Sequence, residues 1–468
     1  MTDGLWSSDR RSLTLGLVLT ITLVAFEALA VSTIMPTVAR ELGGLELYGW
    51  VFSAFFLGSL IGIVVVGGVI DRRGLGWPFA AGLGLFAIGL LIGGLAPTMP
   101  VLVGARFVQG LGAGTVPPIA YVAIGRSLPE AMRARMFATL STAWVLPGVV
   151  GPVVAAAVGQ SLGWRAVFLG LLPLIVLAGV MTLGALRAVV AAPGVVAAET
   201  QAGAADRSRL PLAIVVALGA GLVTVGLTTG EVVPTAALTL SGLVVGIHAL
   251  RRLTPPGTLV ARPVLPAAVL LRGVLTFMFF GVDAFAALVL VSWRGRSLTE
   301  SGLALTAATI AWTAGSWVQA RNATRWPTYR FVQAGFAVAL LGLAGFMVIL
   351  RQDVTWLLGI PTFALAGFGM GLAYAPLALI VLREAAPEAQ GSASSALSLS
   401  DSVGTALGTG VAGAIVAASV RASGEPVPGL AFAFAVSLAV GLGGLLLTGR
   451  LRSRVGAVPA LADRAPTP

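Results

Sequence analysis

Residues 110–130, GLGAGTVPPIAYVAIGRSLPE, have a counterpart in residues 367–388, GFGMGLAYAPLALIVLREAAPE. Each stretch begins with three glycines at alternate positions, and the second set, from Gly367, lies 257 residues after the first, from Gly110. Each stretch also ends with an arginine that is followed, a few residues later, by Pro-Glu. Glycine-rich apolar helices also resemble one another by chance. The shared arginine, proline and glutamate beyond the apolar run favour an internal duplication, of the kind found in membrane proteins built from repeats.

The composition around these stretches is that of a membrane protein. The chain has 468 residues, of which 57% are apolar and 10% are charged, whereas a soluble protein has roughly 25% charged residues. A bilayer core needs roughly 20 apolar residues in a helix, and continuous apolar runs exclude the alternating pattern of a β-barrel. The predicted spans are Ser12–Thr37, Leu47–Ile70, Trp77–Ala96, Pro100–Gly125, Met136–Leu162, Ala166–Leu186, Leu210–Thr229, Val233–Ala249, Val274–Trp293, Leu303–Ala320, Phe331–Leu350, Thr355–Leu382, Ser392–Ser419 and Leu430–Thr448.

These spans predict an all-α integral membrane protein with fourteen transmembrane helices. The repeated stretches fall in the fourth and twelfth spans, so each repeat has six helices and two helices are inserted between the repeats. We therefore predict an N-terminal six-helix bundle over residues 1–190, the inserted helices 7 and 8 with their flanking cytoplasmic loops over 191–266, and a C-terminal six-helix bundle with a short tail over 267–468.

The net charge of +11 reflects membrane topology and not nucleic-acid binding. With the N-terminus inside, 22 of the 29 basic residues, all arginine, fall on inner loops and 6 on outer loops, and Arg106 falls within a span. Cytoplasmic loops collect such residues, so both termini are expected on the cytoplasmic side of a bacterial inner membrane. The first span resembles a signal peptide but is too long for one. With no cysteine and one histidine, the sequence indicates no metal site and no cofactor.

Two six-helix repeats around a midplane site are typical of secondary transporters. The chain resembles the major facilitator superfamily, specifically its fourteen-helix branch of drug:proton antiporters. Residues Gly67 to Gly74, GGVIDRRG, resemble the loop signature G-x-x-x-D-R-x-G, in which Asp71 and Arg72 would lock one conformation. The family's trailing basic residues are replaced here by Leu75 and Gly76, and the alternative is an ordinary polar turn.

The fourth span carries Arg106, Gln109 and Gly110, which resemble the signature R-x-x-Q-G. The resemblance implies a role in handling protons. An arginine about 10 Å deep in a span, from a rise of 1.5 Å per residue, is costly unless it faces the protein interior. The alternative is an arginine whose long side chain reaches the outer interface.

In the fifth span, Pro147-Gly148-Val149-Val150-Gly151-Pro152 resembles the antiporter signature that ends in Gly-Pro. Small residues and prolines allow close packing and a kink, which a rocking interface needs. Ala155-Ala156 replaces the usual Gly-Gly. The alternative is ordinary packing of a membrane helix.

Three acids lie within predicted spans: Glu27, Asp283 and Asp401. Such acids are costly when charged and typically belong to proton or substrate pathways. Glu27 begins the run EALAVSTIMP, similar to the family's first-helix pattern D-x-T-x-x-x-x-A-L-P. The resemblance implies that the three helices line a central cavity. For Asp283 and Asp401 the alternative is a structural hydrogen bond or a pair with Arg106.

The leading prediction is a proton-coupled antiporter that exports hydrophobic or cationic amphipathic compounds, such as drugs, by alternating access. Its partners would be the lipid bilayer, protons and a small amphipathic substrate, without nucleic acid, and the protein would be a monomer. An alternative is an exporter or flippase of lipids or cell-envelope precursors with the same fold. A membrane enzyme or channel is disfavoured, because no nucleophile–base pair, metal cluster or filter-like polar loop is recognisable.

Overall fold

The computed structural model describes residues 5–7, 10–128, 132, 135–136, 139–140, 143–190, 209–229, 231–386 and 389–452. Over this part of the chain the regular structure is entirely helical. The long helices are α1 (Arg11–Leu42), α2 (Tyr48–Arg73), α3 (Gly76–Gly94), α4 (Met99–Ser127), α6 (Val145–Ser161), α7 (Trp164–Leu169) with α8 (Leu171–Val190), α10 (Arg209–Thr228), α11 (Val232–Leu253), α12 (Leu265–Leu288), α13 (Leu298–Asn322), α14 (Thr328–Val348), α15 (Gly359–Glu384), α16 (Gln390–Ser423) and α17 (Val427–Leu447).

Counted with α7 and α8 as one interrupted helix, these elements are the fourteen predicted helices. Twelve of the described helices are long and apolar enough to cross a bilayer. The other two are α6, which is apolar but has 17 residues, and α13, which is more polar and has 25 residues. The all-α fourteen-helix fold predicted from the sequence is therefore confirmed.

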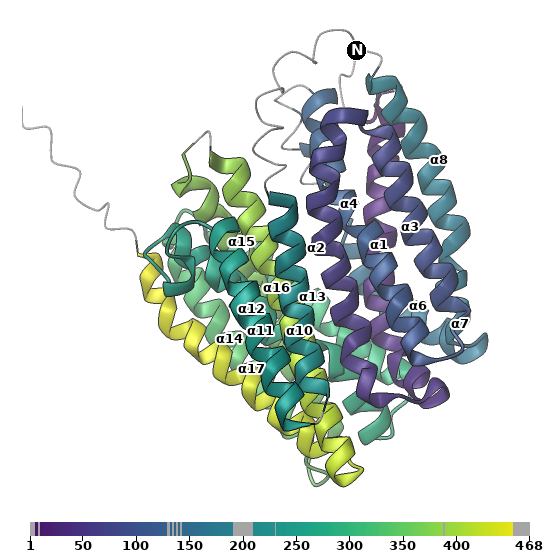
Figure 1. The fold of residues 1–468 in the computed structure, drawn as a ribbon, viewed down its shortest axis with the longest axis vertical. Helices are drawn as coiled ribbons and strands as arrows, with labels where there is room; N and C mark the ends of the chain where they lie inside the picture. The colour runs from purple at the N-terminus through teal and green to yellow at the C-terminus, as the bar shows by residue number, and fades with distance from the viewer. Residues whose placement is uncertain are drawn as a thin grey trace, which may run out of the picture.

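The helices from α1 to α8 and those from α12 to α17 form two bundles that lie side by side (Figure 1). We call the end of the molecule at which α1 begins the N-terminal face, and the other end the opposite face. The helices of the two bundles spread apart toward the N-terminal face, at the top of Figure 1. Across the junction, α2 packs against α16 and α6 packs against α13.

The repeated glycines make equivalent contacts in the two bundles. A Cβ on Gly110 would overlap the carbonyl oxygen of Phe55 in α2, and a Cβ on Gly367 would overlap that of Ala308 in α13. Glycine permits this close approach of two helix backbones. The sequence repeat thus corresponds to a repeat in helix packing.

The inserted helices lie along one side of the junction. α10 packs against α2 and α16, one from each bundle, and α11 packs mainly against α10. A small apolar cluster joins them, made of Leu57, Leu60, Ala213, Val216, Ala217, Ala220, Ala249, Leu399, Val403 and Ala406. The inserted pair therefore contacts both bundles through α10. The predicted domain boundaries at 190 and 266 stay a prediction.

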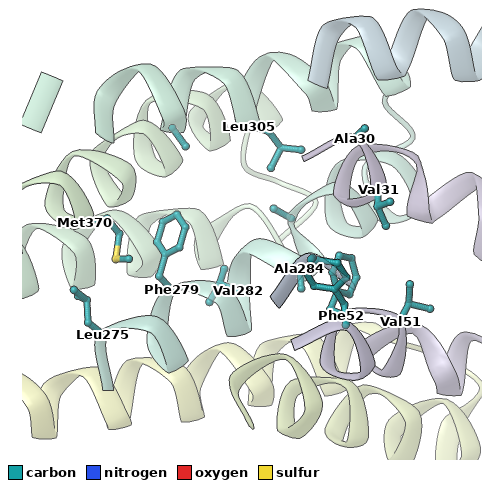
Figure 2. Close-up of a cluster of buried hydrophobic side chains, with 14 of the residues drawn as sticks. Ala30, Val31, Val51, Phe52, Leu275, Phe279, Val282, Ala284, Leu305 and Met370 are labelled. Atoms are coloured by element: carbon teal, nitrogen blue, oxygen red, sulfur yellow. The ribbon is translucent and has the colours of Figure 1, made fainter. Parts of the chain in front are cut away.

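Buried apolar side chains also join the bundles. Figure 2 shows Val31 of α1 and Val51 and Phe52 of α2 near α12 and α13 of the second bundle. All three are buried, as are Ala284 of α12 and Leu305 of α13. The largest hydrophobic cluster contains residues of both bundles, so the two halves pack as one body around their junction.

Two predicted spans differ from the helices. The fifth was expected from Met136, but a turn at Ala143 and Trp144 precedes α6. Pro147 explains the helix start, because proline fits the first turn of a helix but not its interior. The ninth was expected from Val274, whereas α12 begins at Leu265.

Candidate functional site

The first cluster of polar side chains lies inside the N-terminal bundle. Glu27 of α1 and Arg106 of α4 form an ion pair with side-chain exposures of 1% and 3%. The Arg106 Nη1 atom also donates to Oε1 of Gln109 at 2.7 Å, and Nε donates to the carbonyl oxygen of Val51 at 3.3 Å. Arg106 therefore faces the interior of its bundle and does not reach toward the membrane surface.

The close packing of α4 against α2 determines where the Arg106 side chain lies. Gly110, one turn after Arg106, brings α4 against the backbone of α2 at Phe55. The Arg106 guanidinium carbon then lies 4.3 Å from the centre of the Phe55 ring, within the range of a cation–π interaction. Two polar atoms of the cluster, Oε2 of Glu27 and Nε2 of Gln109, have no hydrogen-bond partner among the described residues.

A second cluster lies in the C-terminal bundle. Arg272 of α12 donates from Nε to Oδ1 of Asp401 in α16 at 2.7 Å and from Nη1 to the carbonyl oxygen of Tyr374 in α15 at 2.6 Å. The Tyr374 hydroxyl donates to Oδ2 of Asp401 at 3.3 Å. The guanidinium carbon lies 3.0 Å from the centre of the Tyr374 ring. Three helices of this bundle thus meet at one buried arginine.

Because the ninth span was predicted to begin at Val274, Arg272 was expected in the inner loop before it, which is wrong. α12 begins nine residues earlier than predicted and carries Pro266 in its first turn. Proline near a helix start is a recognised signal, and it would have put Arg272 inside the helix. Of the alternatives weighed for Asp401, a pair with Arg106 is wrong, because Arg106 pairs with Glu27, and Asp401 instead pairs with Arg272.

Asp283 of α12 differs from the other two acids. The structure gives its carboxylate neither a hydrogen bond nor an ion pair with any described residue, and its side chain is half-buried. It lies within electrostatic reach of Tyr48 of α2. The buried Tyr48 hydroxyl also has no hydrogen-bond partner among the described residues. Asp283 therefore lies where α12 of one bundle faces α2 of the other.

A run of aromatic rings leads from this place to the second cluster. The ring of Phe280, three residues before Asp283 on α12, has its centre 6.3 Å from that of Phe56 in α2 and 6.5 Å from that of Trp312 in α13. The Trp312 and Tyr374 rings are 5.4 Å apart. All four side chains are half-buried. The run contains residues of both bundles, and periodicity gave no sign of it because its members are on four helices.

The loop signature lies at the end of α2. Gly74 has φ of 69° and its N–H bonds to the carbonyl oxygen of Ile70 at 3.0 Å. A positive φ favours glycine, which accounts for this member of the signature. Gly67 lies within α2, but the side chains of Asp71 and Arg72 lie outside the described part of the structure, so the conformational lock stays a prediction.

The fifth-helix signature lies at the junction of the bundles. A Cβ on Gly148 would overlap the side chain of Thr309 in α13. Pro152 contacts Gly302 of α13, and Gly151 faces Phe26 of α1. These residues, with Pro147 in the first turn of α6, lie where two halves must move against each other if the protein rocks. No group of three potential metal-ligating side chains occurs among the described residues.

A family model described as the Major Facilitator Superfamily matches residues 17–409. The chain belongs to this superfamily. Its fourteen helices fit the fourteen-helix branch of the Major Facilitator Superfamily that the sequence motifs indicated. Similar solved structures include an autoinhibited POT family peptide transporter, with a TM-score of 0.70 and 17% identity over 96% of this chain and 99% of its own. A D-xylose–proton symporter has a TM-score of 0.66 and 12% identity over 94% of this chain and 97% of its own.

Curated relatives are similar over most of their length. A probable multidrug-efflux transporter of Mycobacterium tuberculosis is 26% identical over 437 residues, which are 88% of each chain. The methylenomycin A resistance protein of Streptomyces coelicolor is 26% identical over 85% of this chain and 82% of its own. Multidrug resistance protein 3 of Bacillus subtilis is 32% identical over 33% of this chain and 30% of its own. This chain is therefore a membrane transporter with relatives in multidrug efflux.

Proposed function

We propose that this transporter exports hydrophobic or cationic amphipathic compounds in exchange for protons, with Asp283 as the group that binds the proton and the cation in turn. The observation that carries the proposal is the difference among the three intramembrane acids. Glu27 and Asp401 each form an ion pair with an arginine. Asp283 forms neither an ion pair nor a hydrogen bond with any described residue. A charge within a membrane-spanning helix that has no partner is costly, so Asp283 gains most from binding a proton or a cation.

The surroundings of Asp283 fit an aromatic organic cation. Phe280 lies three residues before Asp283 on α12, and its ring neighbours those of Phe56 and Trp312. Cations interact favourably with the faces of such rings, and more strongly away from water. A site between the two bundles is also where a secondary transporter built from repeats binds its substrate. The drug-efflux names of the relatives support the same substrate class.

The direction of transport follows from the proposed orientation. Arginines at helix ends gather at the N-terminal face, for example Arg73, Arg252 and Arg383, so this face would be cytoplasmic in a bacterial inner membrane. The bundles spread apart at that face. A cation from the cytoplasm would then reach Asp283, and a proton from the other side would release it after the halves rock. Proton entry supplies about 2.3 kcal/mol per 100 mV.

Everted vesicles test this proposal. A cationic dye should be taken up with a proton signal that a protonophore abolishes, and the Asp283→Asn variant should lose both uptake and the proton signal. Asp283→Glu should keep part of both activities, and the exposed Glu425→Gln should keep all of them. Full proton-coupled uptake of dyes and drugs by Asp283→Asn would refute the assignment. Altered membrane lipids in a deletion strain, with no dye or drug uptake, would favour the lipid-exporting alternative.

A further inference from the structure

An apolar groove of about 430 Å³ lies between α6 and α13, where the two bundles meet. Its wall on α6 is formed by Val145 and Val149. Its wall on α13 is formed by Ile310, Thr313, Ala314, Trp317, Val318 and Arg321. The volume falls within the ~300–1,000 Å³ of ligand-binding pockets. None of the polar residues considered above lines the groove, so it is separate from the proposed transport site.

The groove begins where the contacts between α6 and α13 end. Near the opposite face, Gln160 donates to the hydroxyl of Thr299 at 3.3 Å. Midway, the Thr306 hydroxyl donates to the carbonyl oxygen of Val149 at 3.3 Å. Beyond that point, toward the N-terminal face, the two helices line the groove. The groove is therefore a consequence of the bundles being parted on this side.

The length and depth of the groove match one leaflet of a membrane. From Ile310 to Arg321, α13 rises roughly 16 Å at 1.5 Å per residue, which is about half of a ~30 Å hydrocarbon core. Ile310 and Trp317 are exposed and would face hydrocarbon. An apolar space of this length that is open to hydrocarbon suits the acyl chain of a lipid or another membrane-dissolved molecule.

The end of the groove at the N-terminal face is positively charged. Arg321 lines it, with its guanidinium 5.3 Å from the centre of the Trp317 ring. Arg325 follows in the turn to α14 and Arg330 in the first turn of α14, and residues 321–330 contain no acid. All three arginines are exposed. Basic pockets between membrane helices on the cytoplasmic side recognise anionic lipid headgroups.

From these observations we infer that the groove binds one phospholipid with an anionic headgroup, whose acyl chain lies along Val149 and Ala314 and whose phosphate contacts Arg321. Closing the N-terminal face would bring the start of α6 toward the end of α13 and remove the groove. The lipid therefore binds only the conformation in which the bundles are parted at that face, and it stabilises this conformation. The transported compound plays no part in this binding.

Quenching of Trp317 by brominated lipids tests the inference on the intact chain in phosphatidylcholine nanodiscs. The Trp317 signal is the difference in emission between the wild type and the Trp317→Phe variant. Brominated phosphatidylglycerol should quench it with about fivefold higher apparent affinity than brominated phosphatidylcholine, since an arginine near the surface contributes about 1 kcal/mol. Equal quenching by the two lipids would mean ordinary contact with surrounding lipid and would overturn the inference.

Matched variants separate the headgroup from the groove. Arg321→Gln should abolish the preference for phosphatidylglycerol, whereas Arg251→Gln, an exposed arginine at the same face on α11, should leave it intact. Ala314→Phe should weaken quenching by both lipids because it fills the groove, whereas Val244→Phe on the exposed side of α11 should not. An unchanged preference in Arg321→Gln would also overturn the inference. Because no transport is measured, the result is independent of the proposed function.

Discussion

Arg106 and Glu27 form an ion pair between α4 and α1 in which both side chains are almost completely buried. Removing one partner of such a pair leaves an uncompensated buried charge, whereas removing both charges together is far less damaging. The stability of the N-terminal bundle therefore depends on the two charges being present together or absent together.

Glu27→Gln alone and Arg106→Gln alone are each expected to lower the free energy of unfolding by about 3–5 kcal/mol. The double variant is expected to be more stable than either single one. Denaturation of the purified protein in detergent, arranged as a double-mutant cycle, measures the coupling. Glu425→Gln, an exposed acid between α16 and α17, serves as the control. Additive single effects would contradict a structural pair.

The sequence predicted that Glu27 and Arg106 lie inside the membrane but not that they pair. A charged residue within a long apolar run can be recognised directly in the sequence. The pair, however, joins positions 79 residues apart, and it depends on which faces of α1 and α4 are turned toward each other, which the sequence does not show. The same reasoning missed Arg272, because the boundary of α12 was placed too late. The fourteen helices and the repeat could be predicted because they rest on continuous apolar runs and on the spacing of the glycines. The aromatic run is on four helices and could be found only from tertiary packing.

The repeated glycines are expected to tolerate no side chain. Gly110→Ala and Gly367→Ala should each prevent accumulation of folded protein or lower its melting temperature markedly, because the added Cβ overlaps a backbone carbonyl of the neighbouring helix. Gly443→Ala has open space around the new Cβ and should be neutral or stabilising by up to about 1 kcal/mol. Fluorescence-detected size-exclusion chromatography after heating compares all three. Equal behaviour of the three variants would contradict close backbone packing.

The aromatic run is expected to determine affinity for cations. Trp312→Ala should weaken binding of a cationic dye by roughly 2-fold to 30-fold, corresponding to about 0.5–2 kcal/mol for a cation–π contact. Trp312→Phe should retain part of this affinity, and an uncharged dye of similar size should be less affected. Equilibrium binding to the detergent-solubilised protein measures the difference. Trp326→Ala, at the exposed turn before α14, should bind as the wild type does; a similar loss there would show a general effect.

The orientation can be tested with single cysteines, because the natural chain contains none. Ser423→Cys lies at the exposed end of α16 on the opposite face, and Thr324→Cys lies in the exposed turn after α13 on the N-terminal face. We expect the N-terminal face to be cytoplasmic. A membrane-impermeant maleimide should then label Ser423→Cys in cells whose outer membrane alone has been permeabilised. It should label Thr324→Cys only after the inner membrane has also been broken. The reverse pattern would invert the orientation, and with it the direction in which cations reach Asp283.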